Sequence, residues 1–87
     1  DPDILGVMDA FLSRIADMDP LTGEQVHATL KAIGKELKLG GKKVFMPVRV
    51  ALTGRMHGPE LATLIPLLGV ARTTARIKNS MARLQTD

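Results

Sequence analysis

The residue whose type and neighbours most clearly suit it to binding a ligand is Arg49, which lies between Val48 and Val50. Burying a guanidinium among branched apolar residues is costly unless it meets a ligand or an acid. A guanidinium held in place by such neighbours can form two directed hydrogen bonds to a base edge or a phosphate. The residues leave one alternative open, which is pairing with Glu36 or Glu60, or extension of the side chain into solvent.

The turn over residues 54–59 follows directly and is long enough to expose backbone N–H and C=O groups. Pro59 then begins a predicted helix, because proline is tolerated at a first helical position. The N-terminus of a helix attracts anions. A base edge or a phosphate would therefore suit this turn as well as Arg49.

Catalytic and metal-binding patterns are weak elsewhere in the chain. His27 and His57 are thirty residues apart, and the single pair of an acid and a histidine on a predicted helix, Glu24 and His27, is too little for a metal. Ser13 and Ser80 have no histidine or acid that the sequence places beside them, and cysteine is absent. Nucleophilic catalysis and thiolate ligation need such partners. We therefore expect no catalytic residue and no metal site.

Charge is distributed unevenly over the 87 residues, although the net charge is only +3. Residues 1–20 carry five acids and one base, a balance of −4, whereas residues 31–83 carry eleven bases and two acids, a balance of +9. This asymmetry indicates an anionic partner, nucleic acid or an anionic membrane, and the charge alone leaves a merely solvated basic surface as an equal alternative. No apolar run approaches the ~18 residues that a membrane span needs. With two phenylalanines and no Trp or Tyr, a broad stacking platform is excluded.

Hydrophobic spacing predicts that helices position these residues. Apolar residues three and four apart predict a first helix over residues 3–18, capped by Asp1 or Asp3. Thr22 is placed as the N-cap of a second helix, with Gln25 at capping-box spacing. We expect glycines 40 and 41 to end that helix rather than to cradle a phosphate, since the rest of a phosphate-loop pattern is missing. The second helix carries its lysines on one face, at Lys31, Lys35 and Lys38.

Three shorter helices are predicted to follow. Met46 or Pro47 begins the third, and Gly54 ends it. The fourth covers residues 59–68 and ends at Gly69, and the fifth covers residues 71–85 with Arg72, Arg76 and Arg83 on one stripe. The expected fold is a single all-α domain of about five short helices over residues 1–87. It has an acidic leading helix in 1–19 and a basic part in 20–87.

One long run of residues resembles a known family, the C-terminal anticodon-binding domain of bacterial-type glutamyl-tRNA synthetases, including the organellar ones. The run reads Gly41-Lys42-Lys43-x-Phe45-Met46-Pro47-x-Arg49-x-Ala51-Leu52-Thr53-Gly54-x-x-His57-Gly58-Pro59-Glu60-Leu61, then Leu67-Leu68-Gly69 and Ala71-Arg72-Thr73. The resemblance covers roughly residues 21–85. It implies an all-α part of the helical cage of a class I synthetase, which receives the anticodon loop of glutamate tRNA.

The resemblance also implies roles for particular residues. Arg49 would hydrogen-bond base edges, while the backbone of Gly58 and Pro59, together with Leu61, would meet a splayed base. Some family members have threonine where Gly58 stands, so only backbone groups are available there. The residues around Val70 depart from the family's charged stretch. The candidate phosphate contacts are basic residues near these positions, namely Lys42, Lys43, Arg55, Arg72 and Arg76.

Both catalytic signatures of the class I family, His-x-Gly-His and Lys-Met-Ser-Lys-Ser, are absent. We therefore expect this chain to be catalytically inert and to need no cofactor. A separate catalytic domain of the same parent chain would charge the tRNA with glutamate, using ATP and Mg²⁺. The beginning Asp1-Pro2-Asp3, without an initiator Met or a leader, is typical of a processed or excised piece.

The expected partners are tRNA and the parent's catalytic domain, with neither membrane nor DNA. The expected compartment is the cytoplasm, or an organellar matrix or stroma. One alternative is a stand-alone paralogue that serves as a helical RNA or protein interaction module. A helix-turn-helix DNA-binding domain is a weaker alternative, because no helix carries the polar residues of a recognition helix.

Overall fold

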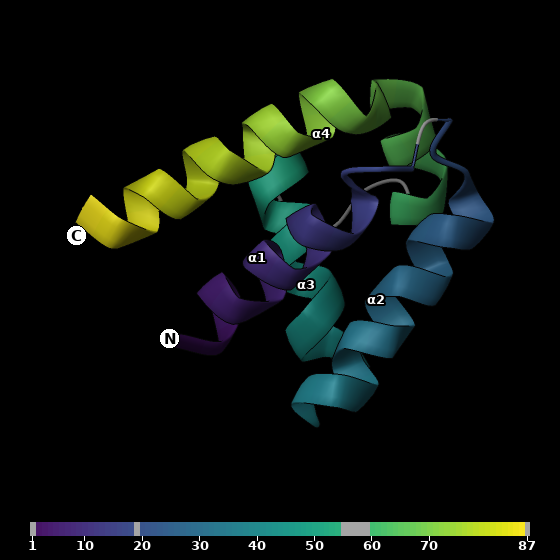
Figure 1. Cartoon of the computed structure of the whole chain (residues 1–87). Coiled ribbons are helices and arrows are strands. Elements are labelled where there is room, and N and C mark those ends of the chain that lie inside the picture. The colour runs from purple at the N-terminus through teal and green to yellow at the C-terminus, as the bar shows by residue number, and fades with distance from the viewer. Residues whose placement is uncertain (1, 19, 55–59, 87) are drawn as a thin grey trace.

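The computed structural model describes residues 2–18, 20–54 and 60–86, and within them the chain is all-helical (Figure 1). The helices are α1 (Pro2–Ile15), α2 (Gly23–Leu37), α3 (Gly41–Thr53) and α4 (Leu61–Thr86). The predicted all-α class is confirmed. The described residues form four helices instead of about five, because residues 61–68 of the predicted fourth helix and the predicted fifth helix are two arms of α4. No helix in the described part of the chain is long and apolar enough to cross a membrane.

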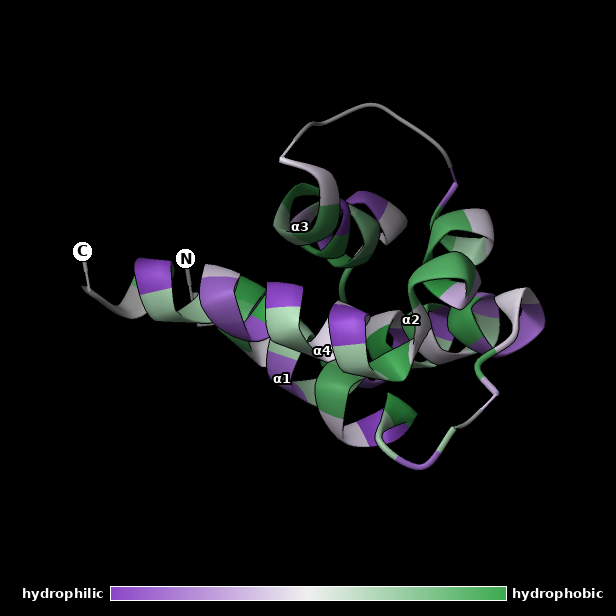
Figure 2. Ribbon diagram, turned by 90° about the horizontal axis from the view of Figure 1, so that it is seen from above, coloured by the Kyte–Doolittle hydropathy of each residue, from purple (hydrophilic) through white to green (hydrophobic). Residues whose placement is uncertain are grey.

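A single core lies among the four helices, each of which contacts the other three. Figure 2 shows hydrophobic and hydrophilic residues alternating around each helix, as amphipathic helices require. The fully buried residues recur at the predicted spacings. In α1 they are Val7, Met8, Phe11 and Ile15; in α2, Val26, Leu30 and Ile33; in α3, Val44 and Val48; and in α4, Ile65 and Ile77.

The first helix is shorter than predicted and ends at Ile15 rather than Met18. Pro2 occupies its beginning, where the missing N–H of proline costs no helical hydrogen bond. Asp3 lies inside the first turn and is therefore not the cap, although an acid there favours the helix dipole. The other predicted cap, Asp1, lies outside the described residues.

The start of α2 matches the prediction. The backbone N–H of Gln25 donates to Oγ1 of Thr22 at 3.2 Å, and the backbone N–H of Thr22 donates to Oε1 of Gln25 at 2.9 Å. This is the complete capping box. Gly23, the first residue of α2, lies so close to α4 that a Cβ atom would stand 2.5 Å from the carbonyl oxygen of Ala62. The box fixes where α2 begins, and the close approach of Gly23 to Ala62 sets α2 against the beginning of α4.

The connection between α2 and α3 differs from the prediction at both ends. Helix α2 ends at Leu37, and Lys38 takes a left-handed conformation (φ 57°) in place of the expected glycine. The backbone N–H of Leu39 donates to the carbonyl of Gly34 at 2.9 Å, which closes the helix end. Gly40 then serves as the N-cap of α3. The glycine pair therefore begins α3 and does not end α2.

Helix α3 begins at Gly41, so the predicted start at Met46 or Pro47 is wrong. Pro47 lies inside the helix, where its missing N–H forfeits one hydrogen bond. The turn before it buries Val44, which is only 1% exposed, four residues from the fully buried Val48. Burial of this extra apolar residue offsets the lost bond, and the gain depends on neighbouring helices.

Helix α4 changes direction at Gly69, whose backbone (φ 81°, ψ 168°) is not helical. That combination is essentially restricted to glycine. The predicted break at Gly69 is thus confirmed, as a kink within one element. The hydroxyl of Thr73 is fully buried and has no hydrogen-bond partner among the residues that the structure describes. In an unbroken helix it would reach the carbonyl four residues earlier, which the kink at Gly69 displaces.

Candidate nucleic-acid interface

Arg49 lies at the border between the core and the surface of α3. Val48 before it is fully buried and Val50 after it is 43% exposed, whereas Arg49 itself is half-buried. Its backbone carbonyl accepts a hydrogen bond from Oγ1 of Thr53 at 2.9 Å. Of the two acids considered as structural partners for Arg49, Glu36 instead forms an ion pair with Arg14 of α1. The backbone under Arg49 is therefore firmly held.

The C-terminal end of α3 is closed by three hydrogen bonds from different sources. Thr53 supplies the first, and the N–H of Gly54 (φ 72°) supplies the second, to the carbonyl of Val50 at 2.8 Å. The third comes from α4, where a guanidinium nitrogen of Arg76 donates to the carbonyl of Leu52 at 3.0 Å. A cation at this end also complements the helix dipole. Arg76, a predicted phosphate contact, therefore has a structural role in holding α3 to α4.

The opposite end of α3 has an unbalanced charge. Lys42 and Lys43 are exposed in its first turn, the turn contains no acid, and the N-cap Gly40 offers no side-chain hydrogen bond. Positive charge at a helix N-terminus opposes the helix dipole and costs stability. An anion bound there would remove the cost and use the free N–H groups. The phosphate contacts expected at Lys42 and Lys43 stay predictions.

The remaining predicted contacts fall into three groups. Arg72 is exposed on α4, one turn before Arg76 on the same face. Leu61 is only 2% exposed and belongs to the core, so its side chain is not presented to a base, contrary to the prediction. The reason is that Leu61 and Ile65 are one turn apart on the buried stripe of α4. Arg55, Gly58 and Pro59 lie outside the described residues.

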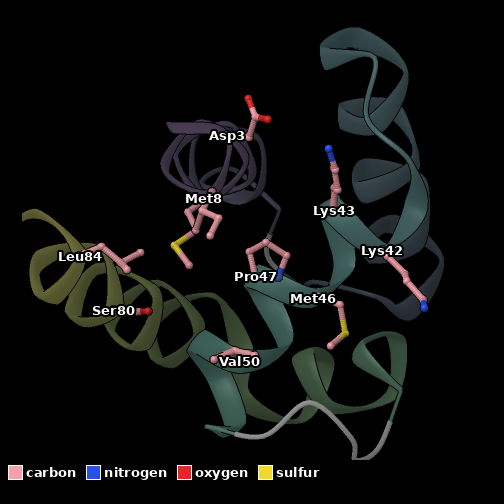
Figure 3. A pocket seen from close by; sticks show the side chains of 10 residues that line it. Asp3, Met8, Lys42, Lys43, Met46, Pro47, Val50, Ser80 and Leu84 are labelled. Atoms are coloured by element: carbon pink, nitrogen blue, oxygen red, sulfur yellow. The ribbon is translucent and has the colours of Figure 1, made fainter. Parts of the chain in front are cut away.

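Sequence reasoning missed two hollows in the surface. The larger, of about 510 Å³, lies between α1, α3 and the end of α4, with an apolar lining that includes Met8, Pro47, Val50 and Leu84 (Figure 3). Asp3 and Lys43 line it from α1 and α3. The smaller, of about 360 Å³, lies between α2 and α3. Their lining residues come from separate helices, so the only signal in the sequence was the exposed apolar positions.

The described residues hold no group of three or more acids and histidines that could bind a metal ion. His27 is exposed on α2, where its ring lies 6.1 Å from that of Phe45, centroid to centroid. Among the described residues, the groups on the page can supply directed hydrogen bonds from a guanidinium, attraction of anions by lysines, and the ring faces of His27 and Phe45.

The described residues thus form a small helical domain with exposed basic residues on α2, α3 and α4 and a half-buried arginine on α3. Residues 1–81 match the sequence model of the anticodon binding domain, and the chain belongs to this family. It is 45% identical over 78 residues to a glutamate–tRNA ligase of Desulfitobacterium hafniense, covering 90% of this chain and 16% of that protein. It is 43% identical over 75 residues to the glutamate–tRNA ligase of Geobacillus stearothermophilus, covering 86% and 15%.

A solved structure agrees with the sequence comparison. The crystal structure of a glutamate tRNA ligase from Elizabethkingia meningosepticum, in complex with its amino acid, superposes with a TM-score of 0.86. The sequences are 26% identical, and the match covers 94% of this chain and 16% of that one. The resemblance to the anticodon-binding domain of glutamyl-tRNA synthetases is thus confirmed. The chain spans about a sixth of the length of these relatives.

Proposed function

We propose that this chain binds the anticodon loop of glutamate tRNA, as the anticodon-binding part of a glutamate–tRNA ligase acting in protein biosynthesis. The observation that carries the proposal is the match to glutamate–tRNA ligases over nine-tenths of the chain. Because the chain spans about a sixth of those proteins, the charging of tRNA with glutamate, with ATP and Mg²⁺, belongs to the rest of the parent protein. Its compartment is one where translation occurs, the cytoplasm or an organelle.

Arg49 supplies the base recognition in this proposal. Unpaired loop bases expose hydrogen-bonding edges that a duplex hides, so a positioned guanidinium can read them. The backbone beneath Arg49 is held by Thr53, and the end of its helix is held by Arg76. Such support fixes the backbone from which the guanidinium extends, and a rigid supporting element favours discrimination between bases.

Lys42 and Lys43 supply attraction for the RNA backbone. They lie about two turns before Arg49 on the same helix, roughly 10 Å along its axis. The phosphate-binding and base-reading groups are therefore separated by a distance that successive nucleotides of a loop can span. Arg72 extends the basic surface on α4. Arg76 adds to it through the guanidinium nitrogens that do not bind the Leu52 carbonyl.

The test is a comparison of two RNA stem-loops, one with the anticodon of glutamate tRNA and one with that anticodon changed, titrated with the wild-type chain. Fluorescence anisotropy of end-labelled RNA gives both dissociation constants. We expect the cognate loop to bind at least tenfold more tightly, since each good base contact discriminates by about 1–3 kcal/mol. Equal affinity for the two loops would overturn the proposal.

A further inference from the structure

The smaller hollow, which we call the α2–α3 cavity, has an apolar floor and a basic rim. Leu30 and Val44 in its floor are buried, and Leu39 and Phe45 are partly exposed. Its rim is formed on α2, by His27, Lys31 and Lys35, all of them exposed. A concave site with apolar walls and a few polar groups at one side is typical of a ligand-binding pocket.

An aromatic ring is available at this cavity. Of the two phenylalanines, Phe11 is fully buried in the core, whereas Phe45 is partly exposed and lines the cavity beside the ring of His27. The His27 and Phe45 rings are tilted by 57° to each other. Unstacked bases bind to aromatic faces with little dependence on sequence. One base needs only one such ring, and Phe45 supplies it. The chain has too few aromatic residues for a platform that stacks several bases.

Positive charge stands beside the ring. Lys31 and Lys35 are one turn apart on α2, and no acid is among the described residues that line the cavity. The neighbouring acid in the sequence, Glu36, is bound to Arg14. Gly41, the first residue of α3, also lines the cavity, so the positive end of that helix dipole adds to the two ammonium groups. An aromatic face next to this charge matches a ligand with a flat base and a phosphate.

The cavity adjoins the residue that we assign to base reading. Gly41, Phe45 and Arg49 are spaced by four residues on α3, so they follow one another along one side of the helix. Phe45 and Arg49 are one turn apart, roughly 6 Å along the helix axis. An RNA strand whose base contacts Arg49 therefore passes directly by the α2–α3 cavity.

From these observations we infer that the α2–α3 cavity binds one nucleotide of the same single-stranded RNA loop. The base packs against Phe45, and the phosphate lies between Lys31 and Lys35. This inference rests on the proposed function, and adds to it a nucleotide subsite built largely from α2. Its contribution is affinity that does not depend on base identity, because stacking and phosphate contacts carry little sequence information.

The test combines three variants with matched controls, all titrated with the cognate stem-loop at several salt concentrations. Phe45→Leu keeps apolar volume but removes the ring, and Met46→Leu, the next residue of α3, is its control. Lys31→Gln and Lys35→Gln each remove one charge, and Lys78→Gln, exposed on α4, is theirs. Melting temperatures establish that every variant is folded before its binding is compared.

We expect Phe45→Leu to weaken binding about tenfold, the scale of losing one stacked base. Each of Lys31→Gln and Lys35→Gln should lower the slope of log affinity against log salt by ~0.7, the value for one phosphate on a single strand. In wild-type chain, stem-loop addition should shift the ring protons of Phe45 upfield in NMR spectra. The inference is overturned if folded Phe45→Leu binds like Met46→Leu, or if both lysine variants behave like Lys78→Gln.

Two further measurements distinguish this inference from the binding of free nucleotides and from the proposed function. AMP and inorganic phosphate, titrated as free ligands, should shift the Phe45 resonances only at far higher concentrations than the stem-loop does. If AMP is bound as tightly as the stem-loop, the cavity serves free nucleotides and the RNA inference is overturned. Anticodon discrimination reports on the proposed function instead. Phe45→Leu should lower the affinity for cognate and altered loops equally, so failure of one idea is distinguishable from failure of the other.

Discussion

Arg76 on α4 donates a hydrogen bond to the backbone carbonyl of Leu52 on α3, two residues that are 24 positions apart in the sequence. The contact satisfies one of the carbonyls that a helix end leaves without a partner. It places a cation at the negative end of α3, the helix that carries Arg49. The C-terminal end of α3 is thus held by a side chain that follows the Gly69 kink in α4.

Replacing Arg76 with glutamine should therefore destabilise the fold by about 1 kcal/mol, the typical loss for one such hydrogen bond. Arg72→Gln, one turn earlier and exposed, is the control and should change the free energy of unfolding by less than about 0.5 kcal/mol. Urea unfolding of both variants measures the difference. Equal stability of the two would show that the Leu52 contact contributes nothing.

Gly23 and Gly6 form a matched pair for testing the approach of α2 to α4. A Cβ at Gly23 would stand 2.5 Å from the Ala62 carbonyl oxygen, whereas a Cβ at Gly6 meets nothing within 4 Å. Gly23→Ala should cost about 1–3 kcal/mol, the usual penalty for overpacking. Gly6→Ala should stabilise the chain by roughly 0.5–1 kcal/mol, because alanine favours helix. Thermal unfolding checks both, and changes of the same sign would contradict the close approach.

Gly69→Ala should destabilise the chain by about 1–3 kcal/mol, because φ 81° and ψ 168° are strained for any residue with a Cβ. Gly54→Asn is the comparison, since its left-handed conformation (φ 72°, ψ 9°) tolerates asparagine. We expect the loss at Gly69 to be the larger of the two in calorimetry. A gain in helical circular dichroism at unchanged stability would mean that α4 straightens freely and the kink is not required.

Arg49→Lys keeps the charge and removes the planar fork of donors. Both Arg49→Lys and Arg49→Ala should weaken binding of the cognate stem-loop by about 1–3 kcal/mol and reduce discrimination against altered anticodons. The loss of affinity should be the larger effect and any fall in melting temperature the smaller one, because the Arg49 side chain is only half-buried. A marked fall in melting temperature without any selective loss for the cognate loop would assign Arg49 a purely structural role.

Lys42→Gln and Lys43→Gln should move stability and affinity in opposite directions. Each removes a positive charge from the first turn of α3, so each should stabilise the fold by about 0.3–1 kcal/mol at low salt. Each should also weaken RNA binding and flatten its salt dependence. Urea unfolding and salt-dependent anisotropy on the same samples test both effects. Lower stability in these variants would show that the lysines make a structural contact.

Local interactions explain what the sequence alone determined. The capping box of Thr22 and Gln25 acts over three residues, and the buried stripes repeat every three or four residues. The break at Gly69 depends on the backbone of a single residue. Each of these signals lies within one helical turn, so the all-helical class and most helix positions followed from the pattern. The family resemblance also came from the sequence alone, through one long run of residues.

Tertiary structure alone decided the features that join separate helices. Helix α3 begins at Gly41 because burying Val44 against other helices offsets the bond that Pro47 forfeits. The side chain of Leu61 turns into the core, and Arg76 reaches Leu52 across 24 residues. The α2–α3 cavity exists only where the two helices meet. Spacing along one helix reports which face is apolar but not what covers it, so these relationships required the packed fold.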